Sequence, residues 1–127
     1  MHNLILIGVG GALGSILRYL LSGLAQQWSK SLAFPFGTLT VNLLGCLVIG
    51  FCAQLAEARG VFTSATRAFV FIGVLGGFTT FSTFGNETMN LFRASATLQA
   101  SINIAAHVIF GLLAVWLGRT LAYLIWR

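Results

Sequence analysis

The stretch GVLGGFTTFSTF, residues 73–84, decides the fold of this 127-residue chain. It lies inside an uncharged run from Ala68 to Asn86, which with its flanks is long enough to cross a bilayer as a helix. Glycine and β-branched hydroxyl residues are poor helix formers, so the stretch predicts a helix that is broken within the membrane. The freed carbonyl groups would be tolerated there only where they line a cavity or bind an ion. Close helix packing by small residues is the alternative that this stretch alone leaves open.

Composition places the whole chain in a membrane. Hydrophobic residues make up 57% of the chain and charged residues 7%, against about 25% charged residues in a soluble domain. A bilayer core of about 30 Å needs about 20 helical residues to cross it. Four apolar stretches meet that length, residues 3–24, 36–56, 67–92 and 95–123. We therefore predict an all-α integral membrane protein in which residues 1–127 form one domain of four transmembrane helices, the third of them broken.

The basic residues are single and separated by apolar stretches. No clustered basic face is present to bind nucleic acid, and such residues at the borders of spans are typical of side chains that reach lipid headgroups. Sorted by the side of the membrane on which they would lie, they divide four against three: Arg59, Arg67, Arg119 and Arg127 against Arg18, Lys30 and Arg93. So small a bias predicts insertion in both orientations and pairing with an inverted copy. A single orientation fixed by other features is the alternative.

Polar and aromatic residues recur at helical spacing on three of the predicted spans. They are Thr38 and Asn42 on the second span, Phe81, Ser82, Thr83 and Phe84 on the third, and Asn103, His107 and Gly111 on the fourth. Taken singly, each has a structural interpretation, because a lone histidine often bonds two helices and a phenylalanine often faces lipid or the core. Polar groups at bilayer depth also mark transport paths. Together the three stripes predict a polar site between the helices.

Two other patterns are interpreted as packing. The run GVGGALG, residues 8–14, has neither the preceding strand nor the later acidic residue of a dinucleotide-binding loop, whereas Gly10 and Gly14 form a small-residue face for a neighbouring helix. Cys46 and Cys52 are about 120° apart around one helix and have no metal-ligand spacing.

The nonapeptide GGFTTFSTF, residues 76–84, resembles the signature of the Fluc (CrcB) family of microbial fluoride channels. Further matches lie in GGALG at residues 10–14, in Arg18 with Tyr19, and in FGTLTVN at residues 36–42, so they cover nearly the whole chain. The resemblance implies an antiparallel, dual-topology homodimer with two fluoride pores. It also implies a multi-pass protein of the bacterial inner (plasma) membrane.

The same resemblance implies a role for individual residues. Phe81 and Phe84 correspond to the paired pore phenylalanines, and Asn42 corresponds to the pore asparagine. The main-chain carbonyls of Gly76 and Thr79 correspond to the ligands of a structural sodium ion at the dimer centre. The remaining implied assignments are hydroxyl groups along the path at Thr38, Ser82 and Thr83, and vestibule residues at Arg18 and Glu87.

Two positions depart from the family pattern. Gly85 stands where serine is usual after the second phenylalanine, and Gly111 stands near a position where a hydroxyl is common on the fourth helix. Asn103 and His107 are the predicted replacement donors for the anion, and water is the alternative.

The predicted function is passive, voltage-driven, fluoride-selective efflux across the membrane. A proton-coupled small multidrug-type exporter has the same architecture, but that mechanism needs a buried carboxylate in the first span, and residues 3–24 contain none. A non-conducting membrane assembly protein is the third candidate, and it would have no need of the broken-helix motif. An enzyme is not expected, because no nucleophile, acid and base are grouped in the sequence.

Overall fold

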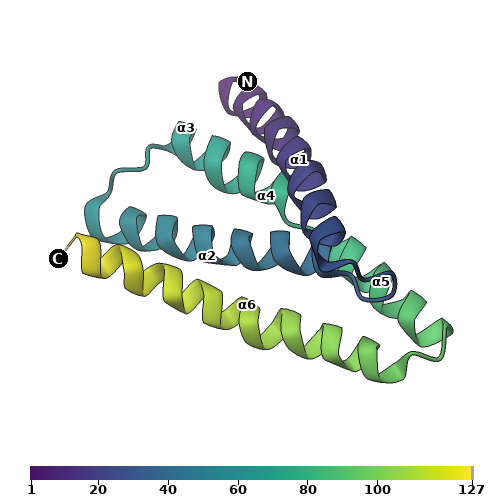
Figure 1. Cartoon of the computed structure of the whole chain (residues 1–127). Helices are drawn as coiled ribbons and strands as arrows, with labels where there is room; N and C mark the ends of the chain where they lie inside the picture. The colour runs from purple at the N-terminus through teal and green to yellow at the C-terminus, as the bar shows by residue number, and fades with distance from the viewer. Residues whose placement is uncertain (127) are drawn as a thin grey trace.

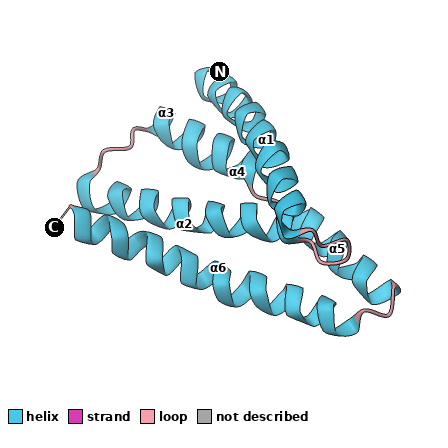
Figure 2. Cartoon of the chain, viewed as in Figure 1, coloured by secondary structure: helices cyan, strands magenta, loops and turns pink. Residues whose placement is uncertain are grey.

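The computed structural model describes residues 1–126, and every element in that part of the chain is helical (Figures 1 and 2). In chain order the elements are α1 (His2–Ser29), α2 (Phe36–Arg59), α3 (Ser64–Arg67), the π-helix η1 (Ala68–Leu75), α4 (Gly76–Phe78), α5 (Phe81–Arg93) and α6 (Thr97–Ile125). The elements from α3 to α5 follow one another as a single interrupted helix. Arg127, which the charge count placed at the C-terminal end, lies outside the described residues.

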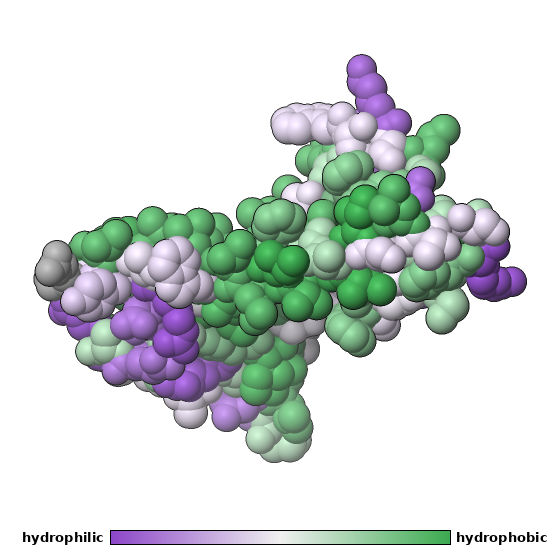
Figure 3. Space-filling model, turned by 90° about the horizontal axis from the view of Figure 1, so that it is seen from below, coloured by the Kyte–Doolittle hydropathy of each residue, from purple (hydrophilic) through white to green (hydrophobic). Residues whose placement is uncertain are grey.

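Four helical segments are long and apolar enough to cross a membrane, as the sequence predicted: His2–Ser29, Phe36–Arg59, Ser64–Arg93 and Thr97–Ile125. On the face seen in Figure 3, hydrophobic side chains cover much of the surface and hydrophilic ones gather toward its ends. The first three segments extend beyond the predicted spans, so the first two connectors are shorter than expected, whereas the fourth segment begins at Thr97, two residues later than predicted. The third segment, for example, begins at Ser64 because the hydroxyl of Thr63 accepts a hydrogen bond from the amide of Thr66, at 3.2 Å, and so caps the helix.

The third transmembrane segment is broken at Thr79 and Thr80, which confirms the prediction made from the glycine and threonine run. Both residues are extended, with φ and ψ of −92° and 155° at Thr79 and of −150° and 111° at Thr80. This interruption is visible as the loop between α4 and α5 (Figure 2). The π-helical element η1, which α4 separates from the break, was not predicted. Such widened turns are rare and are found mostly at functional sites.

Glycine residues let the helices approach until their main chains touch. A Cβ atom at Gly10 would lie 2.6 Å from the carbonyl oxygen of Phe69, and one at Gly14 would lie 2.9 Å from the amide nitrogen of Phe78. The small-residue face predicted on the first helix is therefore a packing face against η1 and α4. On the other side of the molecule α2 and α6 run side by side (Figure 1), and a Cβ at Gly118 would meet the Phe51 amide nitrogen at 2.8 Å.

A matched pair of glycine substitutions on α1 tests this packing. Gly14→Ala is expected to lower the free energy of unfolding by about 1–3 kcal/mol, because the new methyl group overlaps neighbouring main chain. Gly8→Ala is the control, since no atom lies within 4 Å of a Cβ built there. Denaturation of both variants in mixed detergent micelles measures the difference. Equal stability of the two variants would contradict the close contact.

Candidate functional site

The side chain of Asn42 on α2 forms hydrogen bonds with main-chain groups that the helix break leaves without helical partners. Its side-chain Nδ2 donates to the carbonyl oxygen of Thr80 at 3.1 Å, and its Oδ1 accepts from the Thr80 amide at 2.8 Å. The carboxamide thus pairs with both polar groups of one extended residue, as a neighbouring strand would. Unpaired backbone groups inside a bilayer would cost several kcal/mol each, so this side chain makes the break tolerable at bilayer depth.

Thr80 also caps the helix that follows the break. Its hydroxyl oxygen accepts from the Thr83 amide at 3.2 Å, and its hydroxyl group donates to the Thr83 hydroxyl oxygen at 3.0 Å. The hydroxyl oxygen of Ser82 lies 3.3 Å from that of Thr80. The structure therefore places Ser82 and Thr83 in the first turn of α5 around this cap. Thr80 was missing from the predicted site residues, although a threonine directly before a helix is a recognisable N-cap signal.

Two carbonyl groups at the break lose their usual helical hydrogen bonds, because the amides that would donate to them bond elsewhere. In a continuous helix the Thr80 amide would bond Gly76 O and the Thr83 amide would bond Thr79 O, but here these amides bond Asn42 and the Thr80 hydroxyl instead. Gly76 and Thr79 are the two residues assigned to sodium in the sequence analysis. Main-chain oxygens are suitable ligands for a hard cation, so the residues present fit such an ion.

Arg18 on α1 reaches the same break from the other side. Its Nε donates to the carbonyl oxygen of Gly77 at 3.1 Å. A cation at the C-terminal end of a helix satisfies a free carbonyl and opposes the negative end of the helix dipole. Arg18, for which the family resemblance implies a place in a pore vestibule, thus has its guanidinium group against the last turn before the break.

A hollow of about 410 Å³ lies beside the break. It brings together six of the predicted site residues, Asn42, Gly76, Thr79, Phe81, Phe84 and His107. Its other lining residues are Gly45, Cys46, Ile49, Phe71, Leu75, Thr80 and Val108. Three helices share this hollow, because α2, the broken third segment and α6 all contribute to its wall. Five residues of the predicted stripes do not line it: Thr38, Ser82, Thr83, Asn103 and Gly111.

Three rings stand in series along this hollow. The ring centroids of Phe81 and Phe84 are 5.4 Å apart with their planes at 57°. The rings of Phe84 and His107 are closer, with centroids 4.2 Å apart and planes at 40°. Phe81 is 82% exposed, whereas Phe84 is half-buried between its two neighbours. Aromatic rings have an electropositive edge, so such an array can face an anion without presenting an acceptor.

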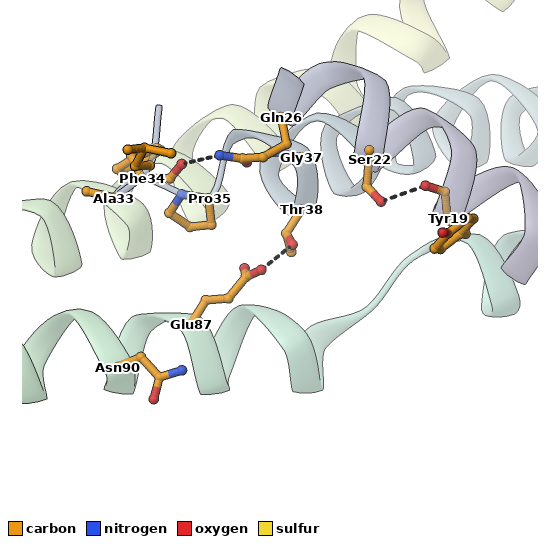
Figure 4. A pocket seen from close by; sticks show the side chains of 12 residues that line it. Tyr19, Ser22, Gln26, Ala33, Phe34, Pro35, Gly37, Thr38, Glu87 and Asn90 are labelled. Atoms are coloured by element: carbon orange, nitrogen blue, oxygen red, sulfur yellow. Dashed lines mark hydrogen bonds between the residues drawn. The ribbon is translucent and has the colours of Figure 1, made fainter. Parts of the chain in front are cut away.

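Thr38 and Glu87 lie in a second cavity of about 480 Å³ near the connector between α1 and α2 (Figure 4). The Thr38 hydroxyl donates to Glu87 Oε1 at 2.7 Å. On the far side of this cavity the Gln26 side chain donates to Phe34 O at 3.1 Å and accepts from the Gly37 amide at 2.9 Å. Thr38 is therefore grouped with Glu87 rather than with the rings. The role of Gln26, which fixes the connector, had no sequence signal.

Asn103 is fully buried between α5 and α6 rather than in either cavity. Its Nδ2 donates to the Thr88 hydroxyl oxygen at 2.9 Å. Thr88 was not predicted, because a threonine within a helix carries no distinctive signal. At the two positions that depart from the family pattern, a Cβ at Gly85 would meet no atom within 4 Å, whereas one at Gly111 would lie 3.7 Å from Cys46 Sγ.

Comparison with known proteins identifies the family. The family described as "CrcB-like protein, Camphor Resistance (CrcB)" matches residues 5–119. A relative from Methanosarcina barkeri, named fluoride-specific ion channel FluC 3, is 42% identical over 122 residues, covering 96% of this chain and 91% of the relative. A fluoride-specific ion channel FluC from Parabacteroides distasonis is 48% identical over 118 residues, covering 93% and 91%. Another from Nitratidesulfovibrio vulgaris is 40% identical over 125 residues, covering 98% and 100%. The chain is therefore a multi-pass membrane protein of the CrcB family, the family of the fluoride-specific FluC ion channels, and not an enzyme.

Proposed function

We propose that this chain forms a fluoride-selective channel that lets the ion leave the cell passively, driven by the membrane voltage. The observation that carries the proposal is the hollow beside the helix break, where a fixed amide and two phenylalanine rings meet within a chain of this family. Hydrofluoric acid enters a cell neutral and dissociates inside it, so a passive anion path suffices for export.

The lining chemistry suits a small, strongly hydrated anion. A carboxamide has two N–H donors, and Asn42 uses one of them on Thr80 O, which leaves the other for an anion. The edges of Phe81 and Phe84 add positive potential without a competing charge. Neither donor set has to reorganise much, because the Asn42 amide is held by two hydrogen bonds and Phe84 stands between two rings.

An antiparallel homodimer is part of the proposal. The break leaves Gly76 exposed and Phe81 82% exposed on one face of the single chain. Polar main chain at bilayer depth is tolerated only inside protein or beside water, so this face needs a cover. The nearly balanced count of basic residues on the two sides supports an inverted second copy as that cover.

The same proposal includes a structural sodium ion at the dimer centre, bound by Gly76 O and Thr79 O of both copies. The diversion of the Thr80 and Thr83 amides supports it, because two oxygens are released without their helical donors. The ion would supply a fixed positive charge where the broken helices meet.

An exporter driven by protons is less well supported. Such a mechanism would need a carboxylate in the first span, and α1 contains none. Glu87, on α5, lies in the second cavity, where it accepts a hydrogen bond from the Thr38 hydroxyl group. It does not line the hollow beside the break. A non-conducting assembly protein would have no use for the hollow.

Loss of the Phe81 ring should abolish most fluoride transport. Phe81→Ile is expected to slow fluoride efflux from liposomes by roughly a hundredfold or more, because the ring edge is part of what replaces water around the ion. Phe110→Ile on α6 is the matched control, since Phe110 is exposed but does not line the hollow. A fluoride electrode measures the efflux, and chloride is the control anion. Chloride release as fast as fluoride release would contradict the selectivity.

The Asn42 amide should be needed for both structure and conduction. Asn42→Asp replaces the donor to Thr80 O with an acceptor and places a negative charge beside the anion path. We expect fluoride efflux to be lost and the free energy of unfolding to fall by about 1–3 kcal/mol. Normal efflux from a correctly inserted Asn42→Asp protein would exclude the proposed amide contact.

Removal of sodium should separate the two copies. Exhaustive exchange of sodium for N-methylglucammonium is expected to weaken the dimer and to stop fluoride efflux, because the freed carbonyl oxygens would then repel one another without a cation between them. Size-exclusion chromatography and efflux after restoring sodium measure both effects. The sodium site is wrong if dimer and flux survive the exchange unchanged.

A further inference from the structure

Phe84 is held at both its main chain and its ring by one closed set of contacts between α5 and α6. The Thr88 hydroxyl donates to Phe84 O at 2.7 Å, and Asn103 Nδ2 donates to the Thr88 hydroxyl oxygen at 2.9 Å. One turn further along α6, His107 Nδ1 lies 3.0 Å from Asn103 O. The imidazole ring of His107 in turn contacts the Phe84 ring, and the two ring centroids are 4.2 Å apart. Thr88 and Asn103 are 7% and 0% exposed, so the hydrogen bond between them is shielded from solvent.

We propose that His107 is the positioning residue of Phe84, and that it keeps the edge of that ring toward the anion path. The inference rests on the proposed fluoride conduction and adds to it a role for α6. The planes of the two rings meet at 40°, so the imidazole covers one face of Phe84. Phe81 is the other aromatic neighbour of Phe84, and the planes of these two rings meet at 57°. With both neighbours in place, the electropositive edge is the part of the ring that an anion in the hollow can approach.

The tautomer of His107 follows from its partner. A main-chain carbonyl oxygen can only accept, so Nδ1 carries the hydrogen in the bond to Asn103 O. In the neutral ring Nε2 is then a bare acceptor, and it is buried without a hydrogen-bond partner among the described residues. Neutral His107 therefore holds Phe84 but cannot itself donate to fluoride. Its role differs in this respect from the donor role expected from the sequence.

Protonation of His107 would strengthen its hold on Phe84. It would place a cation against the ring face, an attractive arrangement, and a positive charge near the anion path. The titratable groups around the hollow are few: α2 contributes Cys46, α6 contributes His107, and the segments of the broken helix contribute none. Glu87, the charged group of α5 nearest in sequence to Phe84, lies in the second cavity.

Two substitutions separate the ring of His107 from its charge. His107→Phe keeps a ring on Phe84 and removes the titration, whereas His107→Leu removes both. Fluoride currents are recorded in planar bilayers at equal pH on both sides, because neutral hydrofluoric acid carries no current. At pH 7.5 we expect His107→Leu to lose roughly tenfold in current and in preference for fluoride over chloride, and His107→Phe to lose much less.

The pH dependence of the fluoride current separates a positioning role from a merely structural one, because a purely structural role of His107 would not change it. Protonation of His107 at low pH should raise the current of the unmodified chain at subsaturating fluoride, and the current of His107→Phe should show no such rise. His2→Gln is the control, because His2 is exposed at the start of α1, far along the chain from the hollow. In the His2→Gln background, ¹⁵N spectra of the remaining histidine should show hydrogen on Nδ1 in the neutral state.

Three results would overturn the positioning role: equal currents in His107→Leu and the unmodified chain, equal losses in His107→Phe and His107→Leu, or a neutral tautomer with hydrogen on Nε2. A missing fluoride current in the unmodified chain would contradict the proposed function instead. In that case the ¹⁵N spectra still decide whether His107 is anchored on Asn103.

Discussion

The pairing of one carboxamide with one extended residue is the interaction on which the rest of the structure depends. A helix cannot be interrupted in hydrocarbon unless its free amide and carbonyl groups find partners, and Asn42 supplies both partners for Thr80. Because the Thr80 amide is used in this way, Gly76 O is released from its helical bond. The break also turns α5 so that Phe81 and Phe84 line the hollow together with Asn42. The Asn42–Thr80 pair therefore underlies both the released carbonyl group of Gly76 and the proposed anion-facing surface.

The surrounding helices hold this arrangement from two sides. On one side α1 packs through glycine against η1 and α4, and Arg18 meets the carbonyl group of Gly77. On the other side α2 carries Asn42 and packs closely along α6, which in turn reaches Phe84 through Asn103 and His107. Close glycine contacts leave these helices little freedom to slide. A pore that must replace water around a small anion benefits from such rigidity, because preorganised donors need no rearrangement when the ion arrives.

The sequence was sufficient for the features that follow from composition and helix propensity. Span length predicted four membrane helices, and the GGFTT segment predicted the break, which the structure places at Thr79 and Thr80. The spacing of Gly10 and Gly14 predicted a packing face. Contacts between residues far apart in the chain could not be predicted from the sequence. The hydrogen bonds of Asn42 with Thr80, of Arg18 with Gly77 and of Asn103 with Thr88 are examples. Such partners depend on how helices are placed in space, and a periodic pattern specifies a face but not its neighbour.

The most direct test of this account is the distance between bound fluoride and specific protons of the chain in a lipid bilayer. Fluorine-to-proton dipolar couplings can be measured by solid-state NMR with selectively labelled phenylalanine and asparagine. The account predicts short distances from fluoride to ring-edge protons of Phe81 and Phe84 and to an Nδ2 proton of Asn42. Fluoride that couples only to water, with those ring and amide protons remote from it, would contradict the claim that this broken helix provides the anion's coordination shell.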